Sequence, residues 1–407
     1  METSAARVAV IGSGPAGLMA AETLAARGVA VTIIERMAAP ARKFLLAGRG
    51  GLNLTHSEPE AQFVERYGAG LSRRMAQALW RFPAADVVAW AEDLGQPTFV
   101  GSSGRVFPKA MKASPLLRAW LARLAAAGVT MRLGTTWRDL GDGGAIVLEH
   151  GGTKSIERFD AVLLALGGAS WPRLGADGSW VAALAAAGIG IAPLVPANVG
   201  VRIVWSEPLK ARAAGQPLKR IMLTVGAETF RGEAMIARDG LEGGVIYAAN
   251  EALRRALETG PARVHLDLRP DVKVEALAAR LAGASAKQSI ANTLRKARVL
   301  PAAISVLREA SPSLPRDPAA LAALVKSVPL TVTGLAGLGR AISTAGGIKF
   351  AGLDDNWMLS ARPGVFAAGE MLDWTAPTGG YLLTACLATG RAAAEGTLRW
   401  LEQRPGT

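Results

Sequence analysis

The chain has 407 residues, of which 50% are hydrophobic and 19% charged, a balance that excludes a disordered chain and is typical of a globular protein with two or three domains. Because Cys386 is the only cysteine, the chain forms neither an internal disulfide nor a redox-active dithiol. The three histidines, His56, His150 and His265, stand far apart in the sequence, so no metal site is expected.

The formal net charge of +13 favours anionic partners such as nucleic acid, phosphorylated small molecules or membrane surfaces. Residues 191–345 alone contain 21 Lys or Arg against 12 Asp or Glu. Two interpretations remain open for this segment, a solvated basic surface or a surface that faces RNA or phosphate. Its basic residues form two local groups: Lys210, Arg212, Lys219 and Arg220, and Arg295, Lys296 and Arg298.

The first predicted element is a buried strand over residues 7–11, and a glycine motif follows it directly. The motif opens an alanine-rich helix that runs to about Ala26. Gly12 permits a tight turn, Gly14 lets the backbone approach a pyrophosphate, and Gly17 allows close helix packing. The helix N-terminus then faces the phosphates, so we expect a dinucleotide site here. The apolar run before the motif is too short for a signal peptide, and a cytoplasmic location is the default expectation.

A second predicted strand, residues 29–35, ends in Glu35. A carboxylate at this position accepts hydrogen bonds from an adenosine ribose and repels a 2′-phosphate, so NAD or FAD is expected and NADP is disfavoured. Residues 45–58 come next, with three glycines and little periodicity. Such a segment is typical of backbone that contacts a ligand.

Residues 159–168 form a further short apolar strand that ends in paired glycines. Residues 180–201 are uncharged and long enough in principle to span a bilayer. Because Gly188, Pro193 and Pro196 interrupt this stretch, we expect a helix that ends near Gly188, followed by a strand, and no membrane segment.

The middle of the chain differs in character from its two ends. Residues 195–235 alternate apolar and turn residues, which predicts several antiparallel strands. Residues 250–327 contain helical stretches separated by Gly and Pro. Residues 237–250, with paired glycines, are either a loop that lines a substrate cavity or a plain β-turn.

The C-terminal part contains another buried strand, in residues 364–373, which ends in Gly369 and Glu370 and precedes a helix over residues 382–403. This order resembles that of FAD proteins with two dinucleotide-binding motifs. The predicted fold class is therefore α/β, with a Rossmann-like FAD-binding domain and an inserted β-barrel-like plus helical substrate domain. The expected boundaries are 1–190 and 340–407 for the FAD-binding domain, 191–248 and about 328–339 for the β-rich part of the insertion, and 249–327 for its helical subdomain.

The segments 42–58, 343–350 and 364–394 together resemble the aminoacetone-oxidase-like and bile-acid-reductase-like family of FAD flavoproteins. The resemblance implies that Glu370 bonds the ribityl chain of FAD and that the helix after it aims its N-terminal dipole at the flavin ring. With the glycine motif, it gives these expected cofactor-binding residues: Gly12, Gly14, Pro15, Ala16, Gly17, Glu35, Arg36, Lys43, Gly48, Gly50, Gly51, Asn53, Leu54, Thr55, Gly167, Gly369, Glu370, Gly379, Gly380, Tyr381 and Leu382.

The chain departs from the family pattern at two places. Where many relatives read Gly-Arg-Cys-Asn-Leu-Thr-Asn, residues 50–56 read Gly-Gly-Leu-Asn-Leu-Thr-His. Leu382 and Thr384 stand where the family often has Asn and Gln. These departures indicate a divergent branch, so the substrate of a characterised relative is not carried over.

Candidate catalytic residues are His56 and Tyr381, because flavin chemistry needs at most one proton donor beside the cofactor. Each has a structural alternative, helix capping for His56 and packing for Tyr381. Glu370 is a third candidate, although a role as ribityl ligand suits it better. Trp374 is expected either to cover a flavin or substrate ring or simply to pack.

The resemblance implies an FAD-dependent oxidoreductase that transfers a hydride between flavin N5 and a substrate held under the inserted domain. The expected reaction is reduction of an unsaturated substrate, which includes an RNA uridine, or oxidation of an amine, with NADH or NADPH as a transient electron donor. The alternative is a flavin-containing RNA-binding or assembly protein without turnover. An NAD-only dehydrogenase is a third possibility, which the C-terminal motif opposes.

Overall fold

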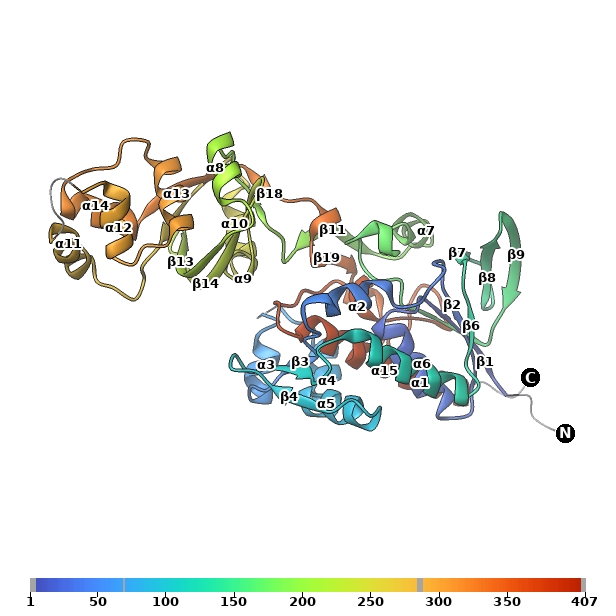
Figure 1. Cartoon of the computed structure of the whole chain (residues 1–407). Coiled ribbons are helices and arrows are strands. Elements are labelled where there is room, and N and C mark those ends of the chain that lie inside the picture. The colour runs from blue at the N-terminus through green and yellow to red at the C-terminus, as the bar shows by residue number, and fades with distance from the viewer. Residues whose placement is uncertain (1–4, 69, 284–287, 404–407) are drawn as a thin grey trace. The chain divides into compact units, whose positions relative to one another are not determined.

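The computed structural model describes residues 5–68, 70–283 and 288–403 (Figure 1). The chain divides into two compact units. The first unit consists of Met1–Val195 and Ser343–Thr407, and the second unit of Pro196–Ile342. The chain therefore leaves the first unit once and returns to it once.

A five-stranded parallel sheet forms the centre of the first unit, in the order β20-β10-β1-β2-β6. All four residues of β10 are buried, as expected for a central strand of a parallel sheet. The strands are β1 (Arg7–Ile11), β2 (Ala30–Ile34), β6 (Thr130–Arg132), β10 (Ala161–Leu164) and β20 (Val365–Ala367).

Two helices from opposite ends of the chain, α1 (Pro15–Ala25) and α15 (Tyr381–Gln403), pack side by side against this sheet (Figure 1). Gly390 of α15 makes the close approach possible, because a Cβ there would lie 2.2 Å from the carbonyl oxygen of Ala16. Gly17 acts in the same way, since its Cβ would lie 2.0 Å from the carbonyl oxygen of Gly12. The two helices thus hold the first glycine motif against the C-terminal part of the chain.

Three smaller sheets and several helices complete the first unit. Strands β7, β8 and β9 form an antiparallel sheet, β3, β5 and β4 form another, and β11 pairs with β19. The strands are β3 (Thr55–His56), β4 (Thr98–Val100), β5 (Arg105–Pro108), β7 (Thr135–Leu140), β8 (Ala145–His150), β9 (Thr153–Arg158), β11 (Ile191–Ala197) and β19 (Ser343–Ile348). The α-helices are α2 (Arg42–Ala47), α3 (Glu60–Glu65), α4 (Arg73–Arg81), α5 (Ala84–Asp93), α6 (Ala113–Ala126) and α7 (Trp180–Ala186). Short 3-10 helices are η1 (Gly48–Gly50), η2 (Pro172–Leu174), η4 (Phe350–Gly352) and η5 (Gly369–Met371).

The second unit is built on a seven-stranded antiparallel sheet in the order β17-β16-β13-β14-β15-β12-β18. Leu223 and Leu266 pair across β13 and β16, and both are buried in the core of this unit. The strands are β12 (Val201–Arg202), β13 (Pro217–Val225), β14 (Glu228–Ala237), β15 (Gly240–Glu242), β16 (Ala262–Asp267), β17 (Val328–Val332) and β18 (Gly334–Leu335). The helices are α8 (Glu207–Ala213), α9 (Gly244–Ala248), α10 (Asn250–Ala256), α11 (Val274–Ala282), α12 (Ile290–Lys296), α13 (Pro301–Ala310), α14 (Pro318–Lys326) and the 3-10 helix η3 (Leu338–Arg340).

The second unit differs from the expected division into a β-rich part and a helical subdomain. Residues 249–327 contain β16, which pairs with β13 and β17, and their helices share one core with the sheet. Residues 237–250 form β15 and α9 instead of an open loop. Gly240 is required there by packing, because a Cβ would lie 1.8 Å from the carbonyl oxygen of Val201.

The uncharged stretch of residues 180–201 is folded as α7 followed by β11, as the interrupting glycine and prolines predict. Leu184 and Trp180 of α7 are buried in the core of the first unit. Among the residues that the structure describes, no helix combines the length and the apolar character needed to cross a membrane.

Candidate cofactor site

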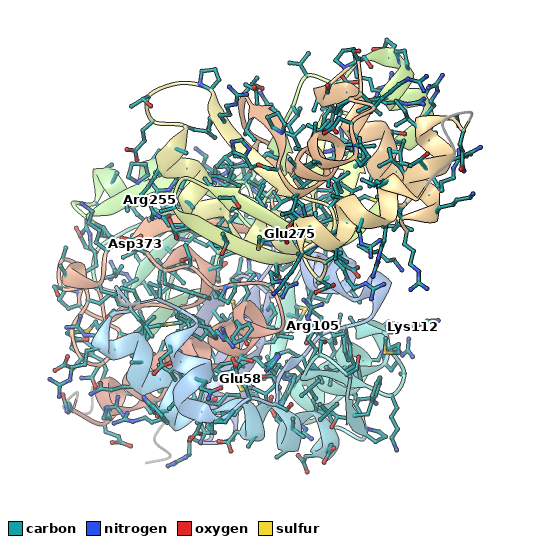
Figure 2. The ribbon with its side chains drawn as sticks, turned by 90° about the vertical axis from the view of Figure 1, so that its left-hand side faces the viewer. Glu58, Arg105, Lys112, Arg255, Glu275 and Asp373 are labelled. Atoms are coloured by element: carbon teal, nitrogen blue, oxygen red, sulfur yellow. The ribbon has the colours of Figure 1, made fainter. Side chains whose placement is uncertain are left out.

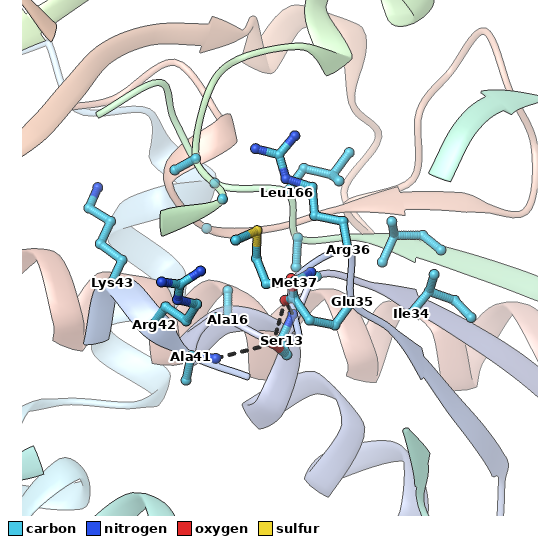
Figure 3. A pocket seen from close by; sticks show the side chains of 18 of the residues that line it. Ser13, Ala16, Ile34, Glu35, Arg36, Met37, Ala41, Arg42, Lys43 and Leu166 are labelled. Atoms are coloured by element: carbon cyan, nitrogen blue, oxygen red, sulfur yellow. Dashed lines mark hydrogen bonds between the residues drawn. The ribbon is translucent and has the colours of Figure 1, made fainter. Parts of the chain in front are cut away.

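A cavity in the first unit opens at the carboxyl ends of β1, β2 and β10 (Figure 3). In parallel sheets this edge is the usual place for a dinucleotide, because the loops after the strands meet there. The cavity is lined by the glycine loop after β1, by the residues after β2 and in α2, and by the segment after β20.

The glycine loop has the geometry that a pyrophosphate requires. Gly12 has a φ of +105°, and a Cβ there would lie 2.3 Å from the carbonyl oxygen of Ala165. In contrast, a Cβ on Gly14 would have no atom within 4 Å, so open space faces this residue. Gly14 is also the N-cap of α1 and has no side-chain capping bond. The Ala16 and Gly17 amides in the first turn of α1 are therefore free to bind an anion.

Glu35 lies beside this loop, immediately after β2 (Figure 3). Its carboxylate accepts hydrogen bonds from the Ser13 N–H at 3.1 Å and the Met37 N–H at 2.8 Å. It also accepts one from the Ser13 hydroxyl, which in turn accepts from the Ala41 N–H at 3.2 Å. The loop after β1 and the loop after β2 are thus tied together through one carboxylate.

Arg36 carries a second indication that a ligand belongs in this cavity. Its Nη1 donates to Asp177 at 2.8 Å, but its Nε is buried and has no partner within the described part of the chain. Burial raises the pKa of Asp177, but the hydrogen bonds from Arg36 and Ser179 outweigh this effect and the pKa is lowered overall. A buried donor without an acceptor is costly, so the Arg36 Nε fits a site that a ligand oxygen completes.

Lys43 and Glu370 form an ion pair within the lining of the cavity. The Lys43 Nζ lies 2.7 Å from one Glu370 oxygen and 3.0 Å from the other, and it also bonds Ser170. Glu370 is only 6% exposed and accepts a further hydrogen bond from the Thr344 N–H at 3.0 Å. The carboxylate is therefore held rigidly by two parts of the chain.

Cys386 of α15 also lines the cavity. Burial, and next the charge of Glu370, raise the pKa of its thiol to about 12, although Lys43 opposes this shift. The thiol is therefore neutral at physiological pH and is not a nucleophile.

The structure brings together about half of the cofactor-binding residues expected from the sequence. Gly17 lies behind the glycine loop as a packing residue. Ten line the cavity: Gly12, Gly14, Pro15, Ala16, Glu35, Arg36, Lys43, Gly167, Gly369 and Glu370. The others lie outside its lining: Gly48, Gly50, Gly51, Asn53, Leu54, Thr55, Gly379, Gly380, Tyr381 and Leu382. The lining also includes residues that no sequence motif marks: Ser13, Met37, Ala41, Trp137 and Asp177.

The segment around residues 48–56 packs against other parts of the first unit. Leu54 is fully buried in the core, and a Cβ on Gly48 would lie 2.5 Å from the Cβ of Ala113. The Thr384 hydroxyl donates to the Thr55 hydroxyl at 2.9 Å, which joins this segment to the first turn of α15. Gly48 therefore has a packing role, whereas a Cβ on Gly50 would have no atom within 4 Å. Contact of these glycines with FAD stays a prediction.

His56 and Tyr381 are neighbours whose rings stack with centroids 5.7 Å apart. The His56 Nε2 lies 3.0 Å from the Ser103 carbonyl oxygen, and its Nδ1 accepts from the Glu58 N–H at 3.2 Å. Both ring nitrogens are thus occupied by backbone groups.

The Tyr381 hydroxyl donates to Glu58, which also pairs with Arg66 at 2.9 Å. Burial, and then the bond to Glu58, raise the pKa of Tyr381 well above its ordinary value. Figure 2 labels Glu58 and Arg105. Arg105 of β5 is the register partner of His56 of β3. A role of His56 or Tyr381 as proton donor stays a prediction.

Trp374 packs instead of standing open. It is 7% exposed, its Nε1 donates to the Gly369 carbonyl oxygen at 2.9 Å, and its ring lies 6.3 Å from that of Tyr67.

Among the described residues, no group of His, Cys, Asp and Glu has the arrangement of a metal site.

The parallel sheet, the glycine loop and the acidic residue after β2 define a Rossmann-like dinucleotide-binding domain. The return of the chain to this domain at β20 and α15 is the order found in FAD-dependent oxidoreductases, and the expected fold class is confirmed. The chain belongs to the HI0933-like family, since the family model described as HI0933-like protein Rossmann domain matches residues 6–396.

The individual proteins that this chain resembles are distant relatives. The chain is 25% identical to the 3-dehydro-bile acid delta(4,6)-reductase of Clostridium scindens over 417 aligned residues, which cover 96% of this chain and 99% of that protein. It resembles the structure of 3-ketosteroid-delta4-(5alpha)-dehydrogenase from Rhodococcus jostii with a TM-score of 0.53, 17% identity and 98% coverage of both chains. The 3-ketosteroid delta1-dehydrogenase of Sterolibacterium denitrificans gives a TM-score of 0.54 at 13% identity, with 96% of this chain and 99% of that one covered. The two structures show that the fold is shared.

Proposed function

We propose that this protein reduces a carbon–carbon double bond conjugated to a ketone in a steroid-like substrate. The observation that carries the proposal is the relationship to the bile acid reductase of Clostridium scindens, which extends over nearly the whole length of both proteins. The second unit of this chain is included in that match, so the likeness is not confined to the cofactor domain.

The residues of the cavity fit FAD. The open space before Gly14 and the free amides of α1 suit the pyrophosphate, and Glu35 suits the adenosine ribose. The unsatisfied Arg36 Nε supplies a further donor to a ligand oxygen. Glu370 suits a polyhydroxylated chain, because it lies in the cavity lining. FAD, when bound, supplies the capacity to accept two electrons from one molecule and deliver them as a hydride to another.

Reduction of a conjugated ketone adds a hydride to the β carbon and a proton to the α carbon. The two electrons must come from a second substrate, for which we propose NADH or NADPH. The chain's own contribution is to hold the cofactor, to exclude water and to provide the proton. Tyr381 and His56 remain the candidate proton donors, with Glu58 and backbone groups fixing their orientation.

The test is a pair of anaerobic experiments on the FAD-loaded protein. In the first, flavin absorbance is followed after mixing with NADH or NADPH, and we expect rapid bleaching. In the second, the reduced protein is mixed with 3-oxo-4-ene and 3-oxo-4,6-diene steroids, and we expect the absorbance to return together with a product two mass units heavier. A reduced flavin that no conjugated steroid reoxidises would contradict the proposal.

Other outcomes identify the alternatives. Bleaching by an amine without NADH or NADPH would indicate an amine oxidase. Reoxidation by cellular RNA, with dihydrouridine as product, would indicate an RNA-modifying enzyme. A protein that binds FAD but is reduced by none of these compounds would indicate a structural flavin.

A further inference from the structure

A second cavity of about 640 Å³ lies in the first unit, between α4, α15 and the residues after η4. It shares no lining residue with the cofactor cavity. Four arginines line it, against a single carboxylate, that of Asp355: Arg73, Arg74 and Arg81 from α4, and Arg399 from α15. The walls of this cavity therefore carry a clear excess of positive charge.

The sequence of α4 directs its arginines into this cavity. Met75, Ala78 and Leu79 are buried in the core and fix the orientation of the helix. Arg73 and Arg81 lie on the polar side, eight residues apart and hence about two turns along the same face. No acidic residue occurs in α4, so nothing on the helix neutralises this row of charges.

Two of the four arginines are held in place by neighbouring groups. The Arg74 Nη1 donates to the Phe350 carbonyl oxygen at 2.7 Å, and its Nε donates to Asp355 at 3.1 Å. Because the Asp355 side chain is 96% exposed, this ion pair neutralises the cavity only weakly. The Arg399 Nε donates to the Asn356 side-chain oxygen at 2.8 Å. The Arg399 guanidinium is therefore held in place only through its Nε.

The other donors lack partners in the part of the chain that the structure describes. No hydrogen bond or ion pair is formed there by Arg73, by Arg81 or by the two terminal nitrogens of Arg399. These groups come from two different helices and face one concave volume. Guanidinium groups arranged in this way match the oxygens of a phosphate group, which they bind through paired, charge-assisted hydrogen bonds.

The wall that carries Asn356 is a strained turn. Trp357, which lines the cavity and is 4% exposed, has a φ of +66°, a left-handed conformation that a bulky side chain rarely adopts. Asp354 stabilises the turn by accepting from the Asn356 N–H at 2.8 Å and the Met358 N–H at 2.9 Å. Strain of this kind persists only where the surroundings enforce it, and it is commonly associated with binding sites.

We propose that this cavity binds a small molecule that carries a phosphate or pyrophosphate group. A cavity of this volume holds one compact ligand, whereas a nucleic-acid surface needs basic residues spread along an extended face. The ligand is therefore a phosphate ester, such as a nucleotide, or free pyrophosphate, and the site is separate from that of FAD.

The test uses FAD-saturated protein, so that nucleotides cannot enter the cofactor cavity. Binding of pyrophosphate, ATP and adenosine is measured by titration calorimetry at low salt. We expect pyrophosphate and ATP to bind and adenosine not to bind. In the variant Arg73→Gln/Arg81→Gln we expect the affinity to fall by roughly tenfold or more, because two charge-assisted contacts are lost. ATP that binds much more tightly than pyrophosphate would identify the ester, and equal affinities would identify the free anion.

The matched control is Arg27→Gln/Arg118→Gln, which removes the same charge from two exposed positions outside the cavity. This control should retain wild-type affinity, and both variants should retain the wild-type flavin spectrum. The proposal is overturned if pyrophosphate and ATP do not bind, if the control loses affinity equally, or if only long RNA binds.

Discussion

The Lys43 ammonium lies 2.7 Å from the carboxylate of Glu370, a residue 327 positions later in the chain. The ion pair joins α2 to the segment after β20. Because Glu370 is 6% exposed, its negative charge depends on this partner for compensation.

We therefore expect Lys43→Met to destabilise the protein by about 3 kcal/mol, since it leaves a buried carboxylate unpaired. Urea unfolding of the apoprotein at pH 7 measures this effect without any contribution from FAD. The double variant Lys43→Met/Glu370→Gln should recover much of the loss. If the double variant is no more stable than Lys43→Met, the loss does not come from the unpaired charge.

Substitutions at Gly12 and Gly14 distinguish effects on folding from effects on cofactor binding. A Cβ on Gly12 would clash with the Ala165 carbonyl oxygen, so Gly12→Ala should lower both the melting temperature of the apoprotein and its FAD content. A Cβ on Gly14 meets only open space, so Gly14→Val should lower the melting temperature much less than Gly12→Ala does. It should nevertheless weaken FAD binding by roughly a hundredfold, because its side chain would occupy the space proposed for the pyrophosphate.

The measurements are thermal unfolding of the apoprotein and flavin absorbance after reconstitution. A Gly14→Val protein that unfolds at the wild-type temperature and binds FAD normally would show that the ligand does not use this loop.

Glu58 makes the stability of the first unit depend on pH. Burial raises its pKa, but the hydrogen bonds from Arg66 and Tyr381 outweigh burial and hold it below the ordinary value of 4.5. A carboxyl group with a lowered folded-state pKa stabilises the protein above its unfolded-state pKa, and this contribution disappears as the pH falls through the folded-state pKa.

The advantage of the wild type over Glu58→Gln should therefore be constant between about pH 5 and 7 and should shrink below about pH 4. Urea unfolding at a series of pH values gives this difference directly. The matched substitution Glu60→Gln, at an exposed position, provides the baseline. A stability advantage of the wild type that grows as the pH falls would contradict a lowered pKa of Glu58.

Substitution of His56 tests whether this residue serves in backbone contacts or in proton transfer. Since both ring nitrogens are occupied by backbone groups, we expect His56→Ala to lower the melting temperature and to reduce kcat by less than roughly tenfold. The pH profile of kcat should keep its shape. A larger loss together with a missing ionisation would instead establish His56 as the proton donor.

The sequence predicted those parts of the fold that depend on neighbouring residues. The strand, glycine loop and helix at residues 7–25 follow from apolar patterning and from the conformational freedom of Gly12. Glu35 could be placed because it directly follows the second strand. The helix α8 was not expected, since its seven residues are too few to show a clear period beside the flanking strands.

Contacts between distant segments were the part that the sequence could not predict. Arg36 pairs with Asp177 across 141 positions, and no local pattern marks Asp177 as a residue of the cavity. The glycines at 48, 50 and 51 suggested a ligand, whereas Gly48 is required by its packing against Ala113. Glycine permits close approach of any kind, and the sequence does not say whether a ligand or another helix approaches.

The contact between Gly390 and Ala16 also bears on how the protein is made. The glycine loop after β1 is translated long before the helix that packs against it and the segment that carries Glu370. A growing chain on the ribosome therefore has an incomplete cavity until α15 has emerged. If FAD binds in this cavity, we expect it to be captured only after α15 has been made, and we expect a chain truncated before α15 to be colourless.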